Sequence, residues 1–129
     1  MRYYEKQWFI SMYGKGDVMG RIERLIHELG INSTYYGYRF LHYAILLAVR
    51  DSSYLLSITT GLYPAIAEKY NTSVYSVERN IRTVVTACWE YGNRDLLKQI
   101  SSYPLNLRPT TGEFIDIIVT YCRQNGIEG

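Results

Sequence analysis

The sequence has only two cysteines and no long apolar run, and both shortages narrow the class of protein that it encodes. Cys88 and Cys122 lie in apolar helical patterns, which favours buried, reduced thiols over a disulfide. No apolar stretch approaches the about 20 residues that a bilayer-spanning helix needs. The first ten residues, MRYYEKQWFI, carry too much charge for a signal peptide. We therefore expect a cytoplasmic protein with no membrane partner.

A strong excess of one charge is also missing. Fourteen Lys and Arg residues face twelve Asp and Glu residues, for a formal net charge of +2, so any polyanion must be bound by locally concentrated positive charge. Tyrosine, in contrast, is abundant, with 14 copies in 129 residues. Many of these side chains should rim the core, because each has a large apolar body and a polar tip. The length fits one domain with a single packed core.

The chain also lacks the residue patterns of an enzyme or a metal site. His27 and His42 are its only histidines, and they fall on different expected helices without zinc-ligand spacing, so packing or surface roles are favoured. The segment GKGDVMG at 14–20 fits neither glycine-rich phosphate-binding fingerprint, and no strand precedes it. We expect no catalytic activity, no metal, no cofactor and no small-molecule substrate.

Apolar residues recur with helical spacing along most of the chain, and no segment alternates convincingly as a strand. Helices are predicted from Asp17 to Gly30, over 37–51, over 58–70, from about 74 to Gly92, from Asn93 to Ile100, and from Thr110 to Gly126, with a loop at 101–109. The first two place these residues in the core: Val18, Ile22, Leu25, Ile26, Leu29, Tyr38, Leu41, Ile45, Leu46 and Val49. The segment 37–51 is so apolar that it should be the central helix. These patterns predict an all-α, compact bundle of about six helices over residues 20–129, preceded by a leader, 1–19, that is either flexible or partly helical.

Helix ends are marked by specific residues. Asp17 is a suitable N-cap, and either Thr72 or Ser73 can cap the helix that follows the polar turn at 71–73. Thr110 and Glu113 have the spacing of a capping box. Pro64 cannot donate to a helix ladder, so the segment 58–70 is either kinked there or divided into two short helices.

The segment TSVYSVERNIRTVVTACW (72–89) raises the question of function. Its apolar stripe contains Val74, Val77, Ile81, Val84, Val85 and Cys88. The opposite side carries Tyr75, Arg79, Arg82 and Thr86, flanked by Ser76, Glu78 and Thr83. A solvated face explains such a pattern in most helices. Here, however, a short helix and a three-residue polar turn precede it, which is typical of a helix-turn-helix whose second helix enters the DNA major groove.

The side chains on this outer face suit the recognition of base edges. An arginine fork can bond the O6 and N7 atoms of guanine together, and a carboxylate can accept from the N4 amine of cytosine. We predict that Glu78, Arg79 and Arg82 contact bases. Flanking or phosphate contacts are predicted for Lys69, Thr72, Ser73, Tyr75, Ser76, Thr83, Thr86 and Arg94.

A family resemblance supports this interpretation. The blocks LIHELG, GYRFLHYAI, SITTGLYPAIAEKYNTS, VERNIR, WEYGN and TTGEFI occur in order over about residues 20–120. Over this span the chain resembles the DNA-binding effector domain of the sporulation-initiation response regulator, stage zero sporulation protein A. The resemblance implies a fold of six helices, a helix-turn-helix formed by the third and fourth, and transcription control through short promoter boxes resembling TGTCGAA. It also implies that Glu78, Arg79 and Arg82 occupy the DNA-contacting positions of the family.

The same resemblance implies protein partners. Members bind tandem boxes on double-stranded promoter DNA as head-to-tail pairs, which suits the modest charge of this chain. The region from Gly92 to about Leu105 matches the surface that contacts the sigma subunit of RNA polymerase in the family. The candidate polymerase contacts in this region are Gly92, Asn93, Arg94, Asp95 and Lys98.

The chain departs from the family pattern in three respects. Tyr75 and Ser76 stand where the family usually has Ser-Arg, and TVVTAC (83–88) replaces a more polar stretch. Residues 1–19 are too short for the phosphoacceptor receiver that the family carries, so we expect no phosphorylation control within this chain, whether it is a natural receiver-less relative or an excerpt. The low charge, the missing receiver and the tyrosine-rich leader favour an alternative function, an interaction module that contacts RNA polymerase or a full-length regulator without binding DNA.

Overall fold

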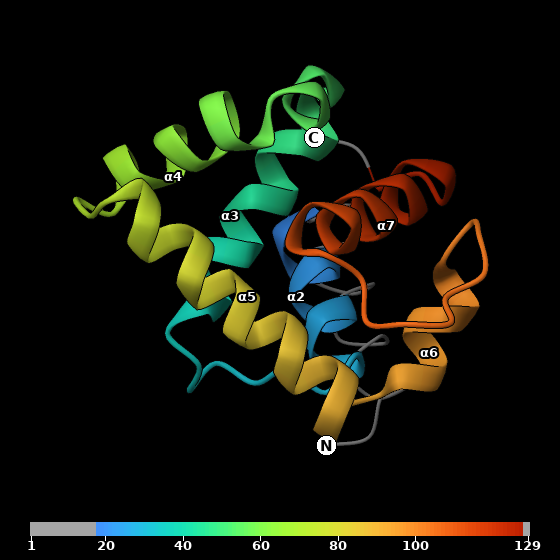
Figure 1. Cartoon of the computed structure of the whole chain (residues 1–129). Coiled ribbons are helices and arrows are strands. Elements are labelled where there is room, and N and C mark those ends of the chain that lie inside the picture. Colours follow the sequence, from blue (N-terminus) through green and yellow to red (C-terminus); the bar gives the residue numbers. More distant parts are fainter. Residues whose placement is uncertain (1–17, 128–129) are drawn as a thin grey trace.

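The computed structural model describes residues 18–127, and in this range the chain is helical without any strand (Figure 1). Six α-helices form the bundle: α2 (Val18–Glu28), α3 (Gly37–Arg50), α4 (Tyr63–Lys69), α5 (Val74–Tyr91), α6 (Arg94–Ile100) and α7 (Thr111–Gln124). The all-α prediction is therefore confirmed. The predicted cap Asp17 and most of the predicted leader 1–19 lie outside the described residues.

Helix α3 is the centre of the bundle. It packs against α2, α4, α5 and α7, and ten of its fourteen residues are buried. Every core residue predicted on it is buried, as are Ile22, Leu25, Ile26 and Leu29 around α2. The strongly apolar composition of 37–51 thus identified the central helix correctly, because a helix that is apolar nearly all round must be covered on most sides.

The segment between α3 and α4 holds two short helical turns, of which the first lies outside the predicted helices and the second falls within the predicted helical segment 58–70. A 3-10 turn, η1 (Ser52–Leu56), follows Asp51, whose carboxylate accepts from the backbone N–H of Ser53 at 3.1 Å. A π-helical turn, η2 (Ile58–Leu62), then runs into α4. Pro64 lies in the first turn of α4, where its missing N–H costs no hydrogen bond. Of the two alternatives for this segment, a separate helix beginning near Pro64 is the one observed.

The turn between α4 and α5 is short and fixed by hydrogen bonds. Asn71 adopts a left-handed conformation with φ of 52°, and the N–H of Thr72 donates to the carbonyl of Ala67 at 2.9 Å. Ser73 is the N-cap of α5, accepting from the N–H of Ser76 at 3.0 Å. The choice between Thr72 and Ser73 as cap is thereby settled in favour of Ser73.

The remaining helix ends follow the predicted caps. The side chain of Asn93 accepts from the N–H of Leu96 at 3.0 Å and begins α6. Thr110 and Glu113 form a reciprocal capping box at the start of α7, with bonds of 3.1 and 2.8 Å. Gly126 follows α7 with φ of 73°.

The two histidines, His27 on α2 and His42 on α3, both contact Tyr38. The ring of His27 is hydrogen-bonded through Nε2 to the hydroxyl of Tyr38 at 3.0 Å. His42 is buried, and its ring stacks on that of Tyr38 with the two centroids 6.4 Å apart. Within residues 18–127 no three His, Cys, Asp or Glu side chains are grouped so that they could hold a metal ion. None of the helices in that range is long and apolar enough to cross a membrane.

Cys88 on α5 and Cys122 on α7 are free thiols and are fully buried, as predicted. Burial raises the pKa of each thiol from 9.0 to about 12. Between these values the folded protein keeps both protons, whereas the unfolded chain releases them. The stabilising effect of the neutral thiols is therefore complete below about pH 9 and is lost as the pH rises toward 12.

We accordingly expect the free energy of unfolding to fall steadily above about pH 9. Urea denaturation at pH 8 to 10.5 measures this fall, and a Cys88→Ala/Cys122→Ala variant should show a flatter dependence because it lacks both groups. Equal unfolding free energies of the wild-type protein at pH 8 and 10.5 would contradict this prediction.

Candidate nucleic-acid interface

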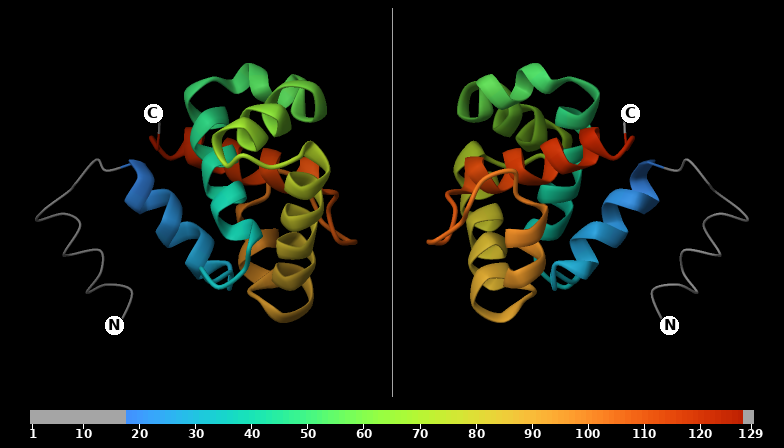
Figure 2. Two further views of the ribbon diagram at one scale, coloured as in Figure 1. Left: turned by 90° about the vertical axis from the view of Figure 1, so that its left-hand side faces the viewer. Right: turned by 90° about the vertical axis from the view of Figure 1, so that its right-hand side faces the viewer.

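Helix α5 has one buried side and one open side. Its stripe of Val77, Ile81, Val84, Val85 and Cys88 is buried, with Val74 half-buried beside it. This stripe packs on α3, α4 and α7. Figures 1 and 2 show that α4 and α5 meet at their shared turn on one edge of the molecule, so the outer side of α5 is not covered by another described helix.

The three predicted base-contacting residues all lie on this open side. Arg79 and Arg82 are exposed and Glu78 is half-buried. Glu78 and Arg82 form a two-point ion pair one helical turn apart: Nε of Arg82 donates to Oε1 of Glu78 at 3.1 Å, and Nη2 contacts Oε2. This hydrogen bond and the carboxylate charge raise the pKa of Arg82 above its usual value. The guanidinium fork of Arg82 is thus held in a fixed orientation on the helix surface.

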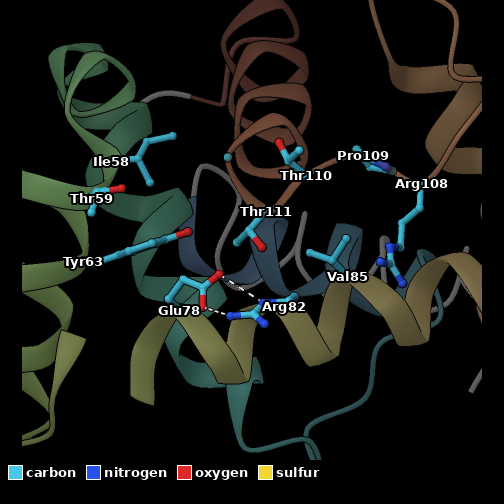
Figure 3. Close-up of a pocket in the computed structure, with 11 residues that line it drawn as sticks. Ile58, Thr59, Tyr63, Glu78, Arg82, Val85, Arg108, Pro109, Thr110 and Thr111 are labelled. Atoms are coloured by element: carbon cyan, nitrogen blue, oxygen red, sulfur yellow. Dashed lines mark hydrogen bonds and ion pairs between the residues drawn. The ribbon is translucent and has the colours of Figure 1, made fainter. Parts of the chain in front are cut away.

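An open pocket of about 440 Å³ borders the Glu78 side of this helix (Figure 3). Its other walls come from η2, from α4, and from the residues that lead into α7. The lining residues are Ile58, Thr59, Tyr63, Glu78, Arg82, Val85, Arg108, Pro109, Thr110, Thr111 and Gly112. Burial, together with the nearby charge of Glu78, raises the pKa of Tyr63 to about 12, so this hydroxyl stays protonated in the wall of the pocket.

A second open pocket, of about 390 Å³, borders the other flank of α5. It is lined by Tyr35, Arg79, Arg82, Thr83, Thr86, Ala87 and Tyr91. Arg82 lines both pockets and its side chain is 55% exposed. It therefore lies on the ridge between them, with Arg79 on one flank and Glu78 on the other.

Most of the predicted flanking hydroxyls already have partners within the helix. The side-chain hydroxyls of Thr83 and Thr86 donate to the carbonyls of Arg79 and Arg82, at 3.1 and 3.0 Å. Ser76 accepts from the amide of Asn80 at 3.2 Å. Tyr75 is 70% exposed, so it projects from the first turn of α5 into solvent.

Lys69 and Arg94, the two predicted cationic DNA contacts outside α5, lie beyond opposite ends of that helix. Lys69 ends α4, where Nζ lies 5.1 Å from the ring centroid of Tyr43. Arg94 begins α6, beyond the C-terminal end of α5, whereas Arg82 lies nine residues before that end. Nε of Arg94 donates to the carbonyl of Trp89 at 2.8 Å, and its guanidinium lies 4.5 Å from the Trp89 ring centroid. The structure thus does not group Arg94 with the other predicted DNA contacts.

Arg108 was not predicted as a site residue, yet it lies beside them. It comes from the loop between α6 and α7, is exposed, and donates through Nη1 to the hydroxyl of Thr86 at 3.2 Å. Arg108 follows Thr86 by 22 residues in the chain, and the path of its loop brings it to α5. No local sequence pattern indicates such a contact.

The predicted polymerase contacts divide into two groups. Gly92 and Asn93 join α5 to the end of α2: the Asn93 N–H donates to the carbonyl of Leu29 at 3.0 Å, and its side-chain amide donates to that of Glu28 at 3.2 Å. A Cβ on Gly92 would lie 2.6 Å from the Leu29 oxygen. Asp95 and Lys98 are exposed on α6, and Asn93 is exposed as well.

The family comparison agrees with this architecture. The family model of the C-terminal domain of the sporulation initiation factor Spo0A matches residues 22–122. The chain belongs to this family. The match runs from α2 into the last turns of α7 and confirms the resemblance seen in the sequence. Members of the Spo0A C-terminal family are DNA-binding effector domains of transcription regulators rather than enzymes, so this chain is a DNA-binding regulatory domain at the level of its family.

Proposed function

We propose that the chain is a sequence-specific transcription regulator of the sporulation-initiation type, which binds short promoter boxes through α5. Helices α4 and α5 act as the helix-turn-helix, and α5 lies in the major groove. The observation that carries this proposal is the open face of α5, where Glu78, Arg79 and Arg82 lie together while the opposite face is buried. A helix anchored on one side can enter a groove with the other.

The contact chemistry follows from the arrangement of these side chains. Arg79 presents its fork to a guanine, and Glu78 accepts from the N4 amine of a neighbouring cytosine. Arg82 exchanges the carboxylate of Glu78 for a base edge or a phosphate, both of which accept two parallel hydrogen bonds. Lys69, Thr72, Ser73, Tyr75, Ser76, Thr83 and Thr86 surround these three contacts.

The wider proposal includes protein partners. Two copies bind head-to-tail on tandem boxes of double-stranded promoter DNA, which shares the phosphate neutralisation between two weakly basic domains. Asn93, Asp95 and Lys98 form the exposed part of the surface proposed to contact the sigma subunit of RNA polymerase.

Replacing Arg79 with alanine is the direct test. Loss of one two-point guanine contact should weaken binding to a TGTCGAA duplex by about 1–3 kcal/mol and relax the preference at a single base pair. Fluorescence anisotropy measures the affinity, and selection from random duplexes measures the preference.

Arg50→Ala is the matched control. Arg50 is exposed at the C-terminal end of α3, whereas Gly37, which packs against α5, lies at the other end of that helix. The binding of Arg50→Ala should be close to that of the wild type. An Arg79→Ala variant that selects the same sequences as the wild type would remove Arg79 from the base contacts.

A second candidate function is favoured by the Glu78–Arg82 ion pair, which neutralises one of the two arginines on this face. In that case the domain is an interaction module for RNA polymerase or a full-length regulator. Wild-type protein that does not distinguish box from scrambled duplex at low salt would support this candidate over the first.

A further inference from the structure

Arg108 is an unpaired cation held against the open face of α5. Within residues 18–127 it makes no ion pair, and its nearest acidic neighbour in the sequence, Glu113, is bound to the N–H of Thr110 in the capping box. Its one hydrogen bond goes to Thr86, whose hydroxyl in turn donates to the carbonyl of Arg82. Two consecutive hydrogen bonds thus fix the guanidinium of Arg108 relative to the backbone of α5.

The remaining donors of Arg108 are available to an anion. A guanidinium has five N–H donors, and only one of them is used here. Arg108 and Arg82 line the same open pocket, in which the carboxylate of Glu78 is already paired with Arg82. Figure 3 shows Arg108 reaching from its loop toward α5 on the far side of Arg82 from Glu78. The positive charge at this end of the pocket is therefore not balanced by a described acid.

We infer that Arg108, positioned by Thr86, binds one backbone phosphate of the duplex whose major groove receives α5; this inference rests on the proposed function. A helix in the major groove has a sugar-phosphate strand along each flank, and Arg108 projects from a neighbouring loop at one flank. It therefore meets the backbone and not a base edge. Phosphate oxygens accept two parallel bonds from a guanidinium, which matches the unused donors.

The later part of α5 contains the sequence TVVTAC (83–88), which has no cation of its own to contact the DNA backbone. Arg108 supplies a cation at this level of the helix. Thr86 lies one turn beyond Arg82 and supplies a hydroxyl that holds a cation from elsewhere in the chain. The loop before α7 thereby provides the backbone contact that α5 lacks at this level.

Arg108→Gln in the full chain tests the inference, with binding to box and scrambled duplexes measured by anisotropy over a range of salt concentrations. Losing one phosphate contact should reduce the slope of log K against log salt by about 0.9. Affinity for both duplexes should fall by a similar factor, on the order of fivefold near 0.15 M salt. The selected base preference should not change. Thr86→Val keeps the charge but removes the hydroxyl, and should produce a smaller loss of the same kind.

The outcomes separate the inference from the proposed function. Arg50→Gln, which removes the same charge elsewhere on the surface, should leave the slope close to the wild-type value. An Arg108→Gln variant with the wild-type slope and affinity, or with an altered base preference, would overturn the phosphate contact while box recognition by Arg79 stands. Wild-type protein without preference for the box would instead overturn the proposed function. Thermal melting of each variant checks that it remains folded.

Discussion

Ile81→Ala is expected to lower the free energy of unfolding by about 2–5 kcal/mol. Ile81 lies in the middle of α5 and is completely buried, so truncation removes buried methyl and methylene groups and leaves a cavity between packed helices. Domains of this size are stable by only about 5–15 kcal/mol. The loss is thus a large share of the total, and the variant should also bind DNA less well when part of the population is unfolded.

Urea denaturation followed by circular dichroism measures this loss, with the dependence on urea concentration expected to stay constant. Leu56→Ala is the control, because Leu56 is 91% exposed and its truncation should change stability by no more than about 0.5 kcal/mol. A loss below 1 kcal/mol for Ile81→Ala would show that this side of α5 is not part of the packed core.

Gly37→Ala is expected to have the second largest effect, about 3 kcal/mol, at the upper end of the range for overpacking. Gly37 begins α3 at the point where this helix crosses α5. A Cβ at Gly37 would lie 2.6 Å from the carbonyl carbon of Asn80 and closer still to its oxygen. Both atoms belong to the backbone of α5, so no side-chain rotation can relieve the overlap and the two helices must separate.

The same substitution at Gly112 is the matched control for Gly37→Ala. There a Cβ would meet only the flexible Cδ1 atom of Ile58, at 3.3 Å. Gly112→Ala should therefore be neutral or stabilise by up to about 1 kcal/mol, since alanine restricts the unfolded chain. Comparable melting temperatures for the two variants would contradict the close packing of α3 on α5.

The bundle could be predicted from the sequence because its determinants are local. Helical spacing of apolar residues located α3 and the buried stripe of α5, and short polar signals such as Ser73, Asn93 and the Thr110–Glu113 pair marked where helices begin. Each of these depends on residues within one or two turns of each other. The 3-10 turn at 52–56 and the π-helical form of 58–62 were not predicted, because such short turns have no apolar period of their own.

The candidate site was predictable only in part. The periodicity of α5 placed Arg79 and Arg82 on its outer face with Glu78 beside them, and side-chain chemistry and the family resemblance both singled out these three residues. The pairing of Glu78 with Arg82 was open to prediction from their spacing of four residues. The contact of Arg108 with Thr86 and the approach of Gly37 to Asn80 were not, because each joins segments whose proximity is decided only by the tertiary fold.

The junction of Gly92 and Asn93 with α2 bears on how genetic defects in this region are interpreted. Changes at either position disturb a backbone contact between distant segments, so we expect such mutants to lose stability whether or not this region contacts a partner. Asp95 and Lys98 lie on α6 instead, Asp95 in its first turn and Lys98 in its last turn, with Nζ of Lys98 5.6 Å from the ring centroid of Trp89. Asp95→Asn and Lys98→Gln remove each charge without reversing it against the helix dipole. The abundance of each mutant protein in cells then separates a loss of stability from the loss of a partner contact under the proposed function.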